Sequence, residues 1–275
     1  RTKADLQTSA CCAGDIMPVH LKQKVDLIED EILARFYGCG CPIPHALHGC
    51  TVLDLGCGTG RDVYLAAQLV GPEGRVIGVD MTENQLEVAR RYMPAQMNKF
   101  GFTEPNVEFK LGYMENLSDV GIESESVDVV ISNCVLNLAP DKRRVFSEII
   151  RVLKPGGEAY FSDVFVDRRL PQTMQSDPVM VGECLGGALY IEDFRRLLAE
   201  LGVPDYRVVK SEVIEPGNDE LSQRMGNARF YSLTVRFFKL GQLEDRCEDY
   251  GQVAWYLGGM PDTPNRFVLD DHHTF

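Results

Sequence analysis

Residues 51–62, TVLDLGCGTGRD, decide the fold that the sequence predicts. An apolar run, Val52–Leu55, leads directly into three glycines spaced two residues apart, and a segment with helical character follows. Those glycines are Gly56, Gly58 and Gly60. Because glycine has no Cβ, it allows a tight turn and lets backbone N–H groups approach a ligand closely. The stretch therefore predicts the first strand, the ligand-binding loop and the helix start of an open α/β sheet.

The segments after this loop alternate between strand-like and helix-like patterns. Apolar runs predict further strands, and apolar residues spaced three and four apart predict helices. The predicted strands span 75–79, 107–111, 126–132 and 158–165, and the predicted helices span 61–70, 83–100 and 141–153. Thr82 is placed to cap the helix that begins at Glu83, and Lys154–Gly157 should end the last helix. This alternation predicts an α/β fold with a parallel, doubly wound, Rossmann-like sheet.

Segments on both sides extend this core. They are an N-terminal amphipathic helix (21–36), a polar insertion (167–189), a helix (191–201), two strands that can form an antiparallel hairpin (206–214 and 230–238), and short strands in the tail (253–257 and 267–269). The predicted organisation is an N-terminal segment and helix over the ligand loop (1–48), a ligand-binding core (49–166), an insertion with the rest of the sheet (167–241), and a small C-terminal subdomain (242–275).

The bulk properties of the 275-residue chain exclude several classes of function. Its length leaves room for one large domain, or for one domain with a small appendage. The net charge of −13 argues against a phosphate backbone or an anionic membrane surface, so neither nucleic acid nor a membrane is an expected partner. The chain has no apolar stretch long enough to cross a bilayer and begins with no apolar signal region, so a cytoplasmic protein is expected.

Nine cysteines are the unusual feature of the composition. They are Cys11, Cys12, Cys39, Cys41, Cys50, Cys57, Cys134, Cys184 and Cys247. An odd number in a long chain without a signal region predicts thiols in a reducing cytosol rather than a disulfide scaffold. No CxxC pair is followed by a second one, and Cys39 and Cys41 are too close for a zinc knuckle, so a structural zinc site is not expected.

Asp80 closes the second predicted strand, 20 residues after Gly60. An acid at this position can accept hydrogen bonds from both hydroxyls of a ribose, which predicts a nucleoside cofactor at the carboxyl edge of the sheet. A dinucleotide loop has the spacing G-x-G-x-x-G, whereas the glycines here follow Asp54 at two-residue steps. S-adenosylmethionine has an α-amino group and no pyrophosphate, and Asp54 can help to hold that cation through the loop. The pattern therefore favours S-adenosylmethionine over a dinucleotide.

Four motifs together resemble the class I S-adenosylmethionine-dependent methyltransferases: 54–60 (DLGCGTG), 80–81 (DM), 126–132 (SVDVVIS) and 151–157 (RVLKPGG). The resemblance implies a seven-stranded sheet whose last strand is antiparallel, with the methionine portion on the glycine loop and the ribose on Asp80. It places Tyr113, Met114 and Glu115 beside the adenine, although core packing is the alternative for Met114. The predicted cofactor-binding residues are Tyr37, Gly38, Asp54, Gly56, Gly58, Gly60, Asp80, Met81, Gln85, Met114, Glu115 and Asn133.

Three cysteines are predicted to meet beside the transferable methyl group. Cys134 follows the fourth predicted strand, whose carboxyl end faces the cofactor cleft. Cys184 lies in the insertion expected to cover that cleft, and Cys39 follows the helix expected over the glycine loop. A small buried hydrophobe is the alternative for any single cysteine. We favour that alternative for Cys41, Cys50, Cys57 and Cys247.

Clustered thiolates are soft ligands that bind soft, thiophilic centres. Trivalent arsenic binds two or three thiolates and keeps a lone pair that accepts a methyl group without a deprotonating base. Most of residues 35–240 resembles the arsenite S-adenosylmethionine methyltransferases, through 35–40 (RFYGCG), 54–62, 78–82 (GVDMT), 132–138 (SNCVLNL), 160–164 (YFSDV) and 182–189 (GECLGGAL). The resemblance implies that Cys39, Cys134, Cys184 and one residue of the Cys11–Cys12 pair are functional, and the spacing to Pro18 favours Cys12.

The predicted function is methylation of arsenite or its thiol conjugates, and then of monomethylarsenite. As(III) is expected on Cys134 and Cys184, with Cys39 as the candidate third ligand. Cys12 or Cys11 is expected to return two electrons by forming a disulfide with Cys39, which thioredoxin or glutathione then reduces. One alternative is a C- or O-methyltransferase of a quinone or sterol-like acceptor, which needs a base and an apolar pocket. The other is a thiol-based metalloid-binding protein on an inactive methyltransferase fold, against which the intact glycine loop and Asp80 argue.

Overall fold

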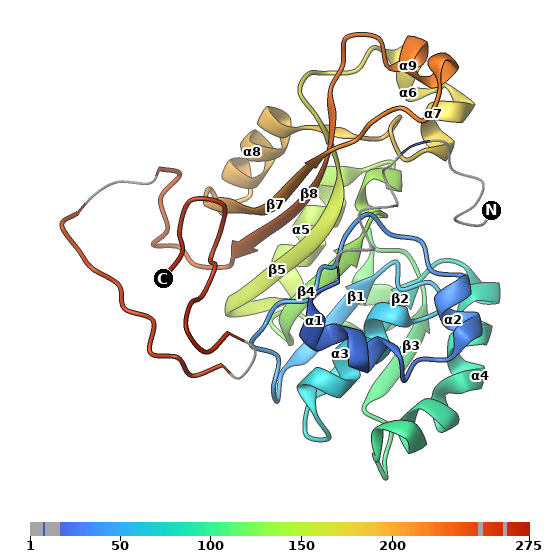
Figure 1. Ribbon diagram of the computed structural model, residues 1–275, viewed down its shortest axis with the longest axis vertical. Helices are drawn as coiled ribbons and strands as arrows, with labels where there is room; N and C mark the ends of the chain where they lie inside the picture. The colour runs from blue at the N-terminus through green and yellow to red at the C-terminus, as the bar shows by residue number, and fades with distance from the viewer. Residues whose placement is uncertain (1–7, 9–16, 247–249, 261–262) are drawn as a thin grey trace.

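One twisted sheet organises the computed structural model, which describes residues 8, 17–246, 250–260 and 263–275 (Figure 1). Its strands are β1 (Thr51–Leu55), β2 (Arg75–Asp80), β3 (Val107–Leu111), β4 (Val127–Asn133), β5 (Leu153–Val166), β6 (Leu189–Tyr190), β7 (Tyr206–Val213) and β8 (Phe230–Phe238). They lie in the order β3-β2-β1-β4-β5-β8-β7, and β6 pairs with β5 outside this path. β8 is antiparallel to both of its neighbours, and the other pairs are parallel. The predicted doubly wound sheet with an antiparallel last strand is therefore confirmed.

Helices cover both faces of the sheet. They are α1 (Val19–Val25), α2 (Asp30–Ala34), α3 (Arg61–Val70), α4 (Glu83–Phe100), α5 (Lys142–Val152), α6 (Gln172–Gln175), α7 (Pro178–Gly182), α8 (Ile191–Glu200) and α9 (Asp219–Met225), with short 3₁₀ turns at η4 (Leu117–Val120) and η5 (Leu136–Leu138). α3 and α4 pack on one face with α1 against α3, whereas α5 and α8 pack on the other. Figure 1 shows α6, α7 and α9 gathered beyond the carboxyl end of β5.

The central strand β1 carries apolar residues on both of its faces. Leu53 and Leu55 face the core that contains Phe146 of α5, while Val52 faces the core formed with α3 and α4. A parallel strand buried on both faces has no polar side to expose, so its apolar residues do not alternate with polar ones. Asp54 interrupts this run and is only 2% exposed, which marks it as a buried acid that needs a reason to be there.

The single N-terminal helix predicted over 21–36 was wrong, because a turn at residues 26–29 divides it into α1 and α2. The side chain of Gln96, fully buried on α4, satisfies the backbone at this turn. Its Nε2 donates to the carbonyl of Leu27 (3.0 Å), and its Oε1 accepts from the N–H of Glu29 (2.8 Å). A distant side chain thus supplies the hydrogen bonds that a continuous helix would have made internally.

Other boundaries also differ from the predictions. Thr82 is the N-terminal cap residue of α4, but its side chain makes no capping hydrogen bond. The segment Lys154–Gly157 follows α5 as predicted, yet it belongs to the 14-residue strand β5 rather than to a loop. The short helix α9 was not predicted. Three turns of amphipathic pattern are the usual sequence signal, and α9 has only 7 residues, too few to display it.

The short strands predicted in the tail were also wrong. Residues 253–257 have no regular secondary structure, and Val268 makes only an isolated antiparallel bridge with Thr274. Side-chain contacts hold the tail against β7 and β8 instead, since Arg207 pairs with Asp270 (2.7 Å) and Arg236 donates to the carbonyl of Leu269 (3.2 Å). Among the described residues, none of the helices combines the length and apolar character needed to span a membrane.

Candidate active site

A cleft lies at the carboxyl ends of β1, β2 and β4, where the chain leaves β1 through the glycine loop. It is lined by Arg35, Phe36, Tyr37, Asp54, Gly56, Cys57, Gly58, Thr59, Asp62, Asp80, Thr82, Gln85, Asn133, Cys134, Val135 and Leu138. Gly56, Gly58 and Gly60 have φ angles of 72°, 53° and 89°, in the left-handed region that favours glycine. The N–H groups of Gly56 and Cys57 both bond to the carbonyl of Val79, which fixes the loop across the end of β2.

Three carboxylates give the cleft a negative interior. Asp54 and Asp62 are buried, and Asp80 lies half-buried at the end of β2. The guanidinium of Arg61 pairs with Asp62 (2.5 Å), and its Cζ lies 3.2 Å from the centroid of the Phe36 ring. The charge of Arg61 is thus already paired. Burial, and then the carboxylates of Asp62 and Asp80, raise the pKa of Asp54 well above its ordinary value. A cation bound in the cleft would relieve this repulsion, whereas a pyrophosphate would increase it.

This charge pattern fits S-adenosylmethionine, which has an ammonium and a sulfonium. The buried Oε1 of Gln85 points to the same conclusion, because it has no hydrogen-bond partner in the described part of the chain although Gln85 lines the cleft. A bound ligand that donates a hydrogen bond would satisfy it. The residues present therefore fit the cofactor that the glycine spacing favours.

Asp80 is held in place by the loop that it faces. Its Oδ2 accepts from the N–H of Gly58 and its Oδ1 accepts from the N–H of Thr82, both at 2.8 Å. Each carboxylate oxygen keeps further lone-pair capacity, which two ribose hydroxyls can use. Asp80 thus serves both as the support of the glycine loop and as the predicted ribose ligand.

Asp80→Asn is expected to weaken S-adenosylmethionine binding by about 10- to 100-fold, because a hydrogen bond to a charged acceptor contributes about 1.5–3 kcal/mol. Isothermal titration calorimetry would measure the dissociation constant. Glu87→Gln, which neutralises an exposed acid on α4 away from the cleft, is the matched control and should bind the cofactor normally. An Asp80→Asn variant with unchanged affinity would contradict the ribose assignment.

A second hollow begins at Met81, the residue after Asp80, and is lined by Leu111, Gly112, Tyr113, Asn116, Asp119 and Val120. Met81 and Tyr113 are 66% and 64% exposed, so two large apolar side chains are available to cover an adenine ring. Met114 instead packs against the core, and the carbonyl of Glu115 accepts from Arg144. Neither lines the hollow, so their adenine contacts stay predictions, and core packing accounts for the position of Met114.

Asn133 joins the segment that carries Cys39 to the end of β4. Its Oδ1 accepts from the N–H groups of Cys39 (3.0 Å) and Gly40 (3.3 Å), and its Nδ2 donates to the carbonyl of Gly40 and to Asp62, both at 3.0 Å. The close approach requires glycines on both sides of Cys39. A Cβ on Gly38 would lie 2.6 Å from Asn133 Cγ, and one on Gly40 would lie 2.3 Å from Ser162 Oγ.

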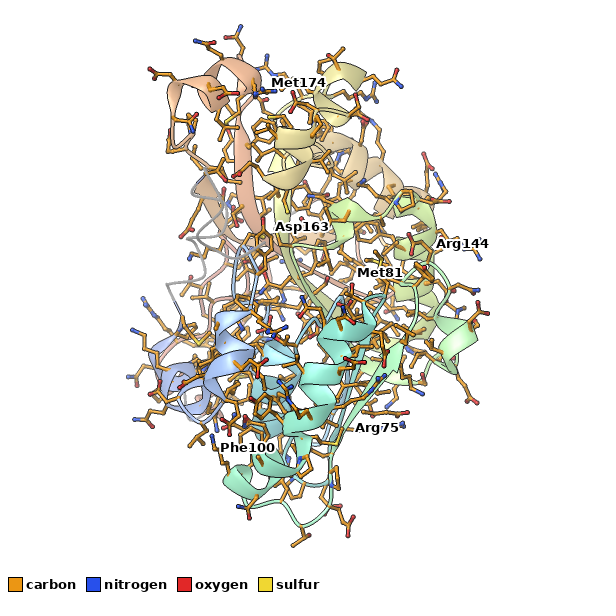
Figure 2. The ribbon with its side chains drawn as sticks, turned by 90° about the vertical axis from the view of Figure 1, so that its right-hand side faces the viewer. Arg75, Met81, Phe100, Arg144, Asp163 and Met174 are labelled. Carbon is orange, nitrogen blue, oxygen red and sulfur yellow. The ribbon has the colours of Figure 1, made fainter. Side chains whose placement is uncertain are left out.

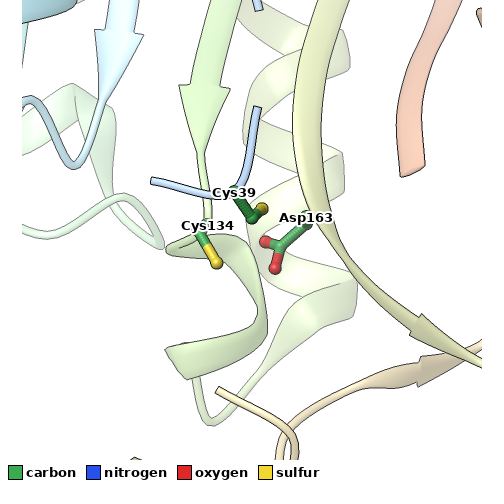
Figure 3. Close-up of side chains that lie close together, drawn as sticks. All are labelled: Cys39, Cys134 and Asp163. Carbon is green, nitrogen blue, oxygen red and sulfur yellow. The ribbon is translucent and has the colours of Figure 1, made fainter. Parts of the chain in front are cut away.

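Two of the predicted thiols lie together, with a carboxylate that was not predicted. The sulfur atoms of Cys39 and Cys134 and an oxygen of Asp163 all lie within 4.8 Å of one another, and all three residues are buried. Figure 3 shows the three side chains converging from the N-terminal segment, the end of β4 and the carboxyl half of β5. Register explains the position of Asp163, because Asn133 pairs with Ser162, which places Cys134 beside the next residue of β5.

Cys184 belongs to the same buried cluster as Cys39 and Cys134. Its sulfur lies 3.4 Å from the hydroxyl of Tyr37, a residue that also lines the cofactor cleft. Cys134 and Cys184 both have a φ of 61°, a left-handed conformation that is uncommon for residues other than glycine. Sparsely populated backbone conformations of this kind gather at functional sites, where the surrounding structure enforces them.

In the view of Figure 2, Asp163 lies between Met81, directly after β2 and below it, and Met174 of α6 above it. Its carboxylate accepts from the N–H (3.1 Å) and the side-chain Nδ2 (2.7 Å) of Asn137, and from the N–H of Val164 (2.7 Å). Burial raises the pKa of Asp163 to about 7, although these hydrogen bonds oppose the change. The carboxyl is therefore poised between its two protonation states near neutral pH.

This raised pKa predicts the direction of a pH effect on stability. Between about pH 4 and pH 7 folded Asp163 keeps a proton that the unfolded chain has lost, so the free energy of unfolding should fall as pH rises. Asp163→Asn removes the ionisation and should flatten that fall. Urea denaturation at several pH values would measure the slope of the free energy of unfolding against pH. A loss of stability that is the same at every pH does not change this slope. A variant with the slope of the unsubstituted chain would contradict the pKa of Asp163.

The other cysteines lie apart from this cluster or outside the described residues. Cys57 packs against Gly78, where a Cβ would come within 2.8 Å of its sulfur, and burial raises its thiol pKa. Burial also raises the pKa of Cys41 to about 12, and that of Cys50 at the start of β1. These positions suit small buried hydrophobes. Cys11, Cys12 and Cys247 lie outside the described residues.

Residue 8, the one described residue among the first 16, contacts the loop that carries Cys184. Thr8 is buried and its hydroxyl donates to Glu183 (2.9 Å), the residue before Cys184. Thr8 also forms an isolated bridge with Pro216. Residue 8 therefore lies close to the loop that carries Cys184, and Cys11 and Cys12 follow only three and four residues later.

Asp62 and Asp163 are two acids of this region that were not predicted as site residues; Arg35, Phe36, Thr59, Thr82, Val135 and Leu138 also line the cleft without having been predicted there. Asp62 ends the quoted stretch TVLDLGCGTGRD, so its position at the start of the first core helix was a usable signal. Asp163 lies in YFSDV at the carboxyl half of a predicted strand, and an acid within an apolar strand was likewise a signal.

Comparisons with known proteins agree on one family. Residues 47–202 match the family described as a methyltransferase domain. The chain is 50% identical to an arsenite methyltransferase of Aquipseudomonas alcaligenes over 99% of this chain and 78% of that protein, and 44% identical to that of Mus musculus over 100% and 73%. The crystal structure of an arsenic(III) S-adenosylmethionine methyltransferase from Chlamydomonas reinhardtii matches with a TM-score of 0.90 at 51% identity, covering 94% of this chain and 87% of that one.

Proposed function

The chain belongs to the arsenite methyltransferases, which depend on S-adenosylmethionine, and we propose that it methylates As(III) held by the thiols of Cys39, Cys134 and Cys184. The observation that carries this proposal is the convergence of Cys39 and Cys134 beside a cleft whose charge suits the methyl donor. Cys134 belongs to both, since it lines the cleft and takes part in the thiol cluster. Thiolates are soft ligands, and they bind a thiophilic centre such as As(III) in preference to harder cations.

Binding proceeds by exchange. Each thiol displaces a hydroxide or an external thiol from arsenic, and the proton of the cysteine leaves with the displaced group as water or as free thiol. No electrons change hands in this step. Cys184 lies in the loop after α7, and Cys39 lies in the N-terminal segment. Bound arsenic would therefore link these two segments of the chain.

Methyl transfer then needs positioning rather than base catalysis. S-adenosylmethionine would supply the methyl group of its sulfonium to the arsenic lone pair, and the broken S–C bond would leave neutral S-adenosylhomocysteine. Asp54 and Asp62 would hold the ammonium, Asp80 the ribose, and Cys134 would hold arsenic at the edge of the same cleft. The sulfonium charge disappears as the methyl group moves, so a buried site that excludes water favours the reaction.

The methylated arsenic is formally pentavalent and must regain two electrons. We infer that Cys39 and Cys12 (or Cys11) supply them: the free thiol attacks the arsenic-bound sulfur of Cys39, the As–S bond breaks with its electron pair left on arsenic, and one disulfide forms with release of one proton. Thioredoxin or glutathione then reduces this disulfide. The contact between Thr8 and Glu183 supports this relay, because Thr8 precedes Cys11 by three residues and Glu183 precedes Cys184 by one. The regenerated thiols then accept arsenic for a second cycle on monomethylarsenite.

Incubation of the chain with arsenite, S-adenosylmethionine and a thiol reductant, followed by arsenic speciation, tests the proposal. Mono- and dimethylated arsenic are the expected products. Arsenite binding without methylation would instead indicate a metalloid-binding protein. Methylation of a quinone in place of arsenite would indicate a C- or O-methyltransferase.

Cys39→Ser should impair methylation of arsenite more than methylation of monomethylarsenite, by a ratio of about 10 or more in single-turnover rates. Arsenite uses three thiolates, whereas monomethylarsenite has one position already filled by carbon and needs only two. Single-turnover conditions keep the reductive step out of the measurement. Cys41→Ser, two residues away, is the control that should preserve both rates, and equal losses on the two substrates would contradict the division of roles.

A further inference from the structure

The carboxylate of Asp163 has no role in the proposed arsenic chemistry. As(III) selects thiolates, and methyl transfer to its lone pair needs no acid or base. Yet Asp163 is buried, and one of its oxygens lies within 4.8 Å of the sulfur atoms of both Cys39 and Cys134. Burying an acid is costly unless it is paired or bound to a metal, so this position needs an explanation.

The surrounding structure orients Asp163 as a ligand. Three N–H groups hold its two oxygens: the backbone and side chain of Asn137, and the backbone of Val164. Such outer hydrogen bonds fix the carboxylates that bind metal ions and are part of a metal site. Each oxygen still keeps lone-pair capacity toward the two thiols, which Figure 3 shows on the same side of β5 as the carboxylate.

We propose that Cys39, Cys134 and Asp163 bind a divalent cation of borderline softness, of the Zn²⁺ type, and that this cation competes with As(III) for the enzyme. Two thiolates and one carboxylate are a ligand set that Zn²⁺ accepts, whereas Mg²⁺ and Ca²⁺ prefer oxygen ligands alone. Zinc bonds are about 2.3 Å to sulfur and about 2.0–2.2 Å to carboxylate oxygen, so one ion can bridge donors that lie this close after small side-chain rotations.

Binding releases the two thiol protons to solvent and transfers no electrons. Three protein ligands leave a fourth position for water, as in an exchangeable zinc site rather than a closed structural one. The cation would therefore occupy the arsenic position reversibly and leave the ribose and glycine-loop contacts untouched. Inhibition should be competitive with arsenite and not with S-adenosylmethionine. The inference rests on the proposed function only in that the divalent cation and As(III) would share Cys39 and Cys134.

Cobalt(II) is the probe for this site because it replaces zinc and reports its ligands by absorbance. The 275-residue chain, reduced with a phosphine, should bind one Co²⁺ with visible bands of a tetrahedral ion and a near-ultraviolet thiolate-to-cobalt band. Zinc should displace the cobalt, and so should arsenite. Absence of a thiolate band at millimolar Co²⁺, or a band that arsenite leaves unchanged, would overturn the proposal even if no variant folds.

Asp163→Asn separates this site from the arsenic site. It should weaken Co²⁺ and Zn²⁺ binding by about 10-fold or more, with arsenite affinity close to that of the unsubstituted chain. Asp128→Asn is the matched control, since Asp128 also accepts a backbone N–H, from Thr51 (2.8 Å), but lies at the opposite end of the sheet. Equal metal affinity in the Asp163 variant would overturn the proposal. The arsenic speciation assay contains no added cation, so failure of methylation there would be a separate result.

Discussion

Cys134→Ser is expected to lower the rate of arsenite methylation by more than about 100-fold, a loss of about 3 kcal/mol or more of transition-state stabilisation. Cys134 is the thiol common to the cofactor cleft and the thiol cluster, and serine oxygen is a hard ligand that does not replace sulfur on arsenic. Binding of S-adenosylmethionine should change little, because the glycine loop and the acids hold the methyl donor. Arsenic speciation would measure the rate, and calorimetry the cofactor affinity.

Cys184→Ser should behave in the same way, since Cys184 belongs to the same buried cluster. Cys50→Ser is the matched control, because Cys50 precedes β1 at the other end of the sheet and should tolerate the change. A Cys134→Ser enzyme that methylates arsenite at the normal rate would refute the thiol site. Equal loss of cofactor affinity would show that the substitution acts on the fold instead.

Asn133→Ala is expected to damage both halves of the site. The side chain makes four hydrogen bonds, to the backbone of Cys39 and Gly40 and to Asp62, and all are buried. Each contributes about 0.5–1.5 kcal/mol, so the free energy of unfolding should fall by about 2–6 kcal/mol. Methylation should fall by about 100-fold, because the segment of Cys39 and the cleft acid Asp62 both lose their anchor.

Asn133→Asp divides these effects. It keeps an acceptor for the N–H groups of Cys39 and Gly40, but it loses the donor to the Gly40 carbonyl and places a second carboxylate beside Asp62. The repulsion lies in the cofactor cleft, so the substitution should impair cofactor binding more than arsenite binding. Asn98→Ala, on the exposed face of α4, is the control for losing an asparagine. Denaturant unfolding and cofactor titration would be measured on all three. An Asn133→Ala enzyme with normal stability would show that these four bonds do not hold the segment.

The sheet and the glycine loop could be predicted because their signals are local. A buried parallel strand appears in the sequence as an apolar run, and a left-handed turn usually requires glycine. Val52–Leu55 and the three loop glycines therefore indicated the strand and the loop directly. The broken N-terminal helix could not be predicted in this way. Its break depends on Gln96, whose side chain reaches it from almost 70 residues away in the sequence.

The thiol cluster was predictable only in part. The carboxyl edge of the sheet correctly placed Cys134 at the cofactor cleft. The neighbouring Asp163 depends on register, and the pairing of β4 with β5 shifts between Val127 and Val129. A shift of one residue turns a side chain to the other face of a strand, so no sequence pattern alone could decide that Asp163 faces the thiols.

The left-handed backbone at Cys134 and Cys184 decides which replacement these two positions tolerate best. A residue with a Cβ pays about 1–2 kcal/mol in this conformation, and glycine does not. Glycine should therefore be the easiest replacement at both positions, and it would erase the thiol without unfolding the chain.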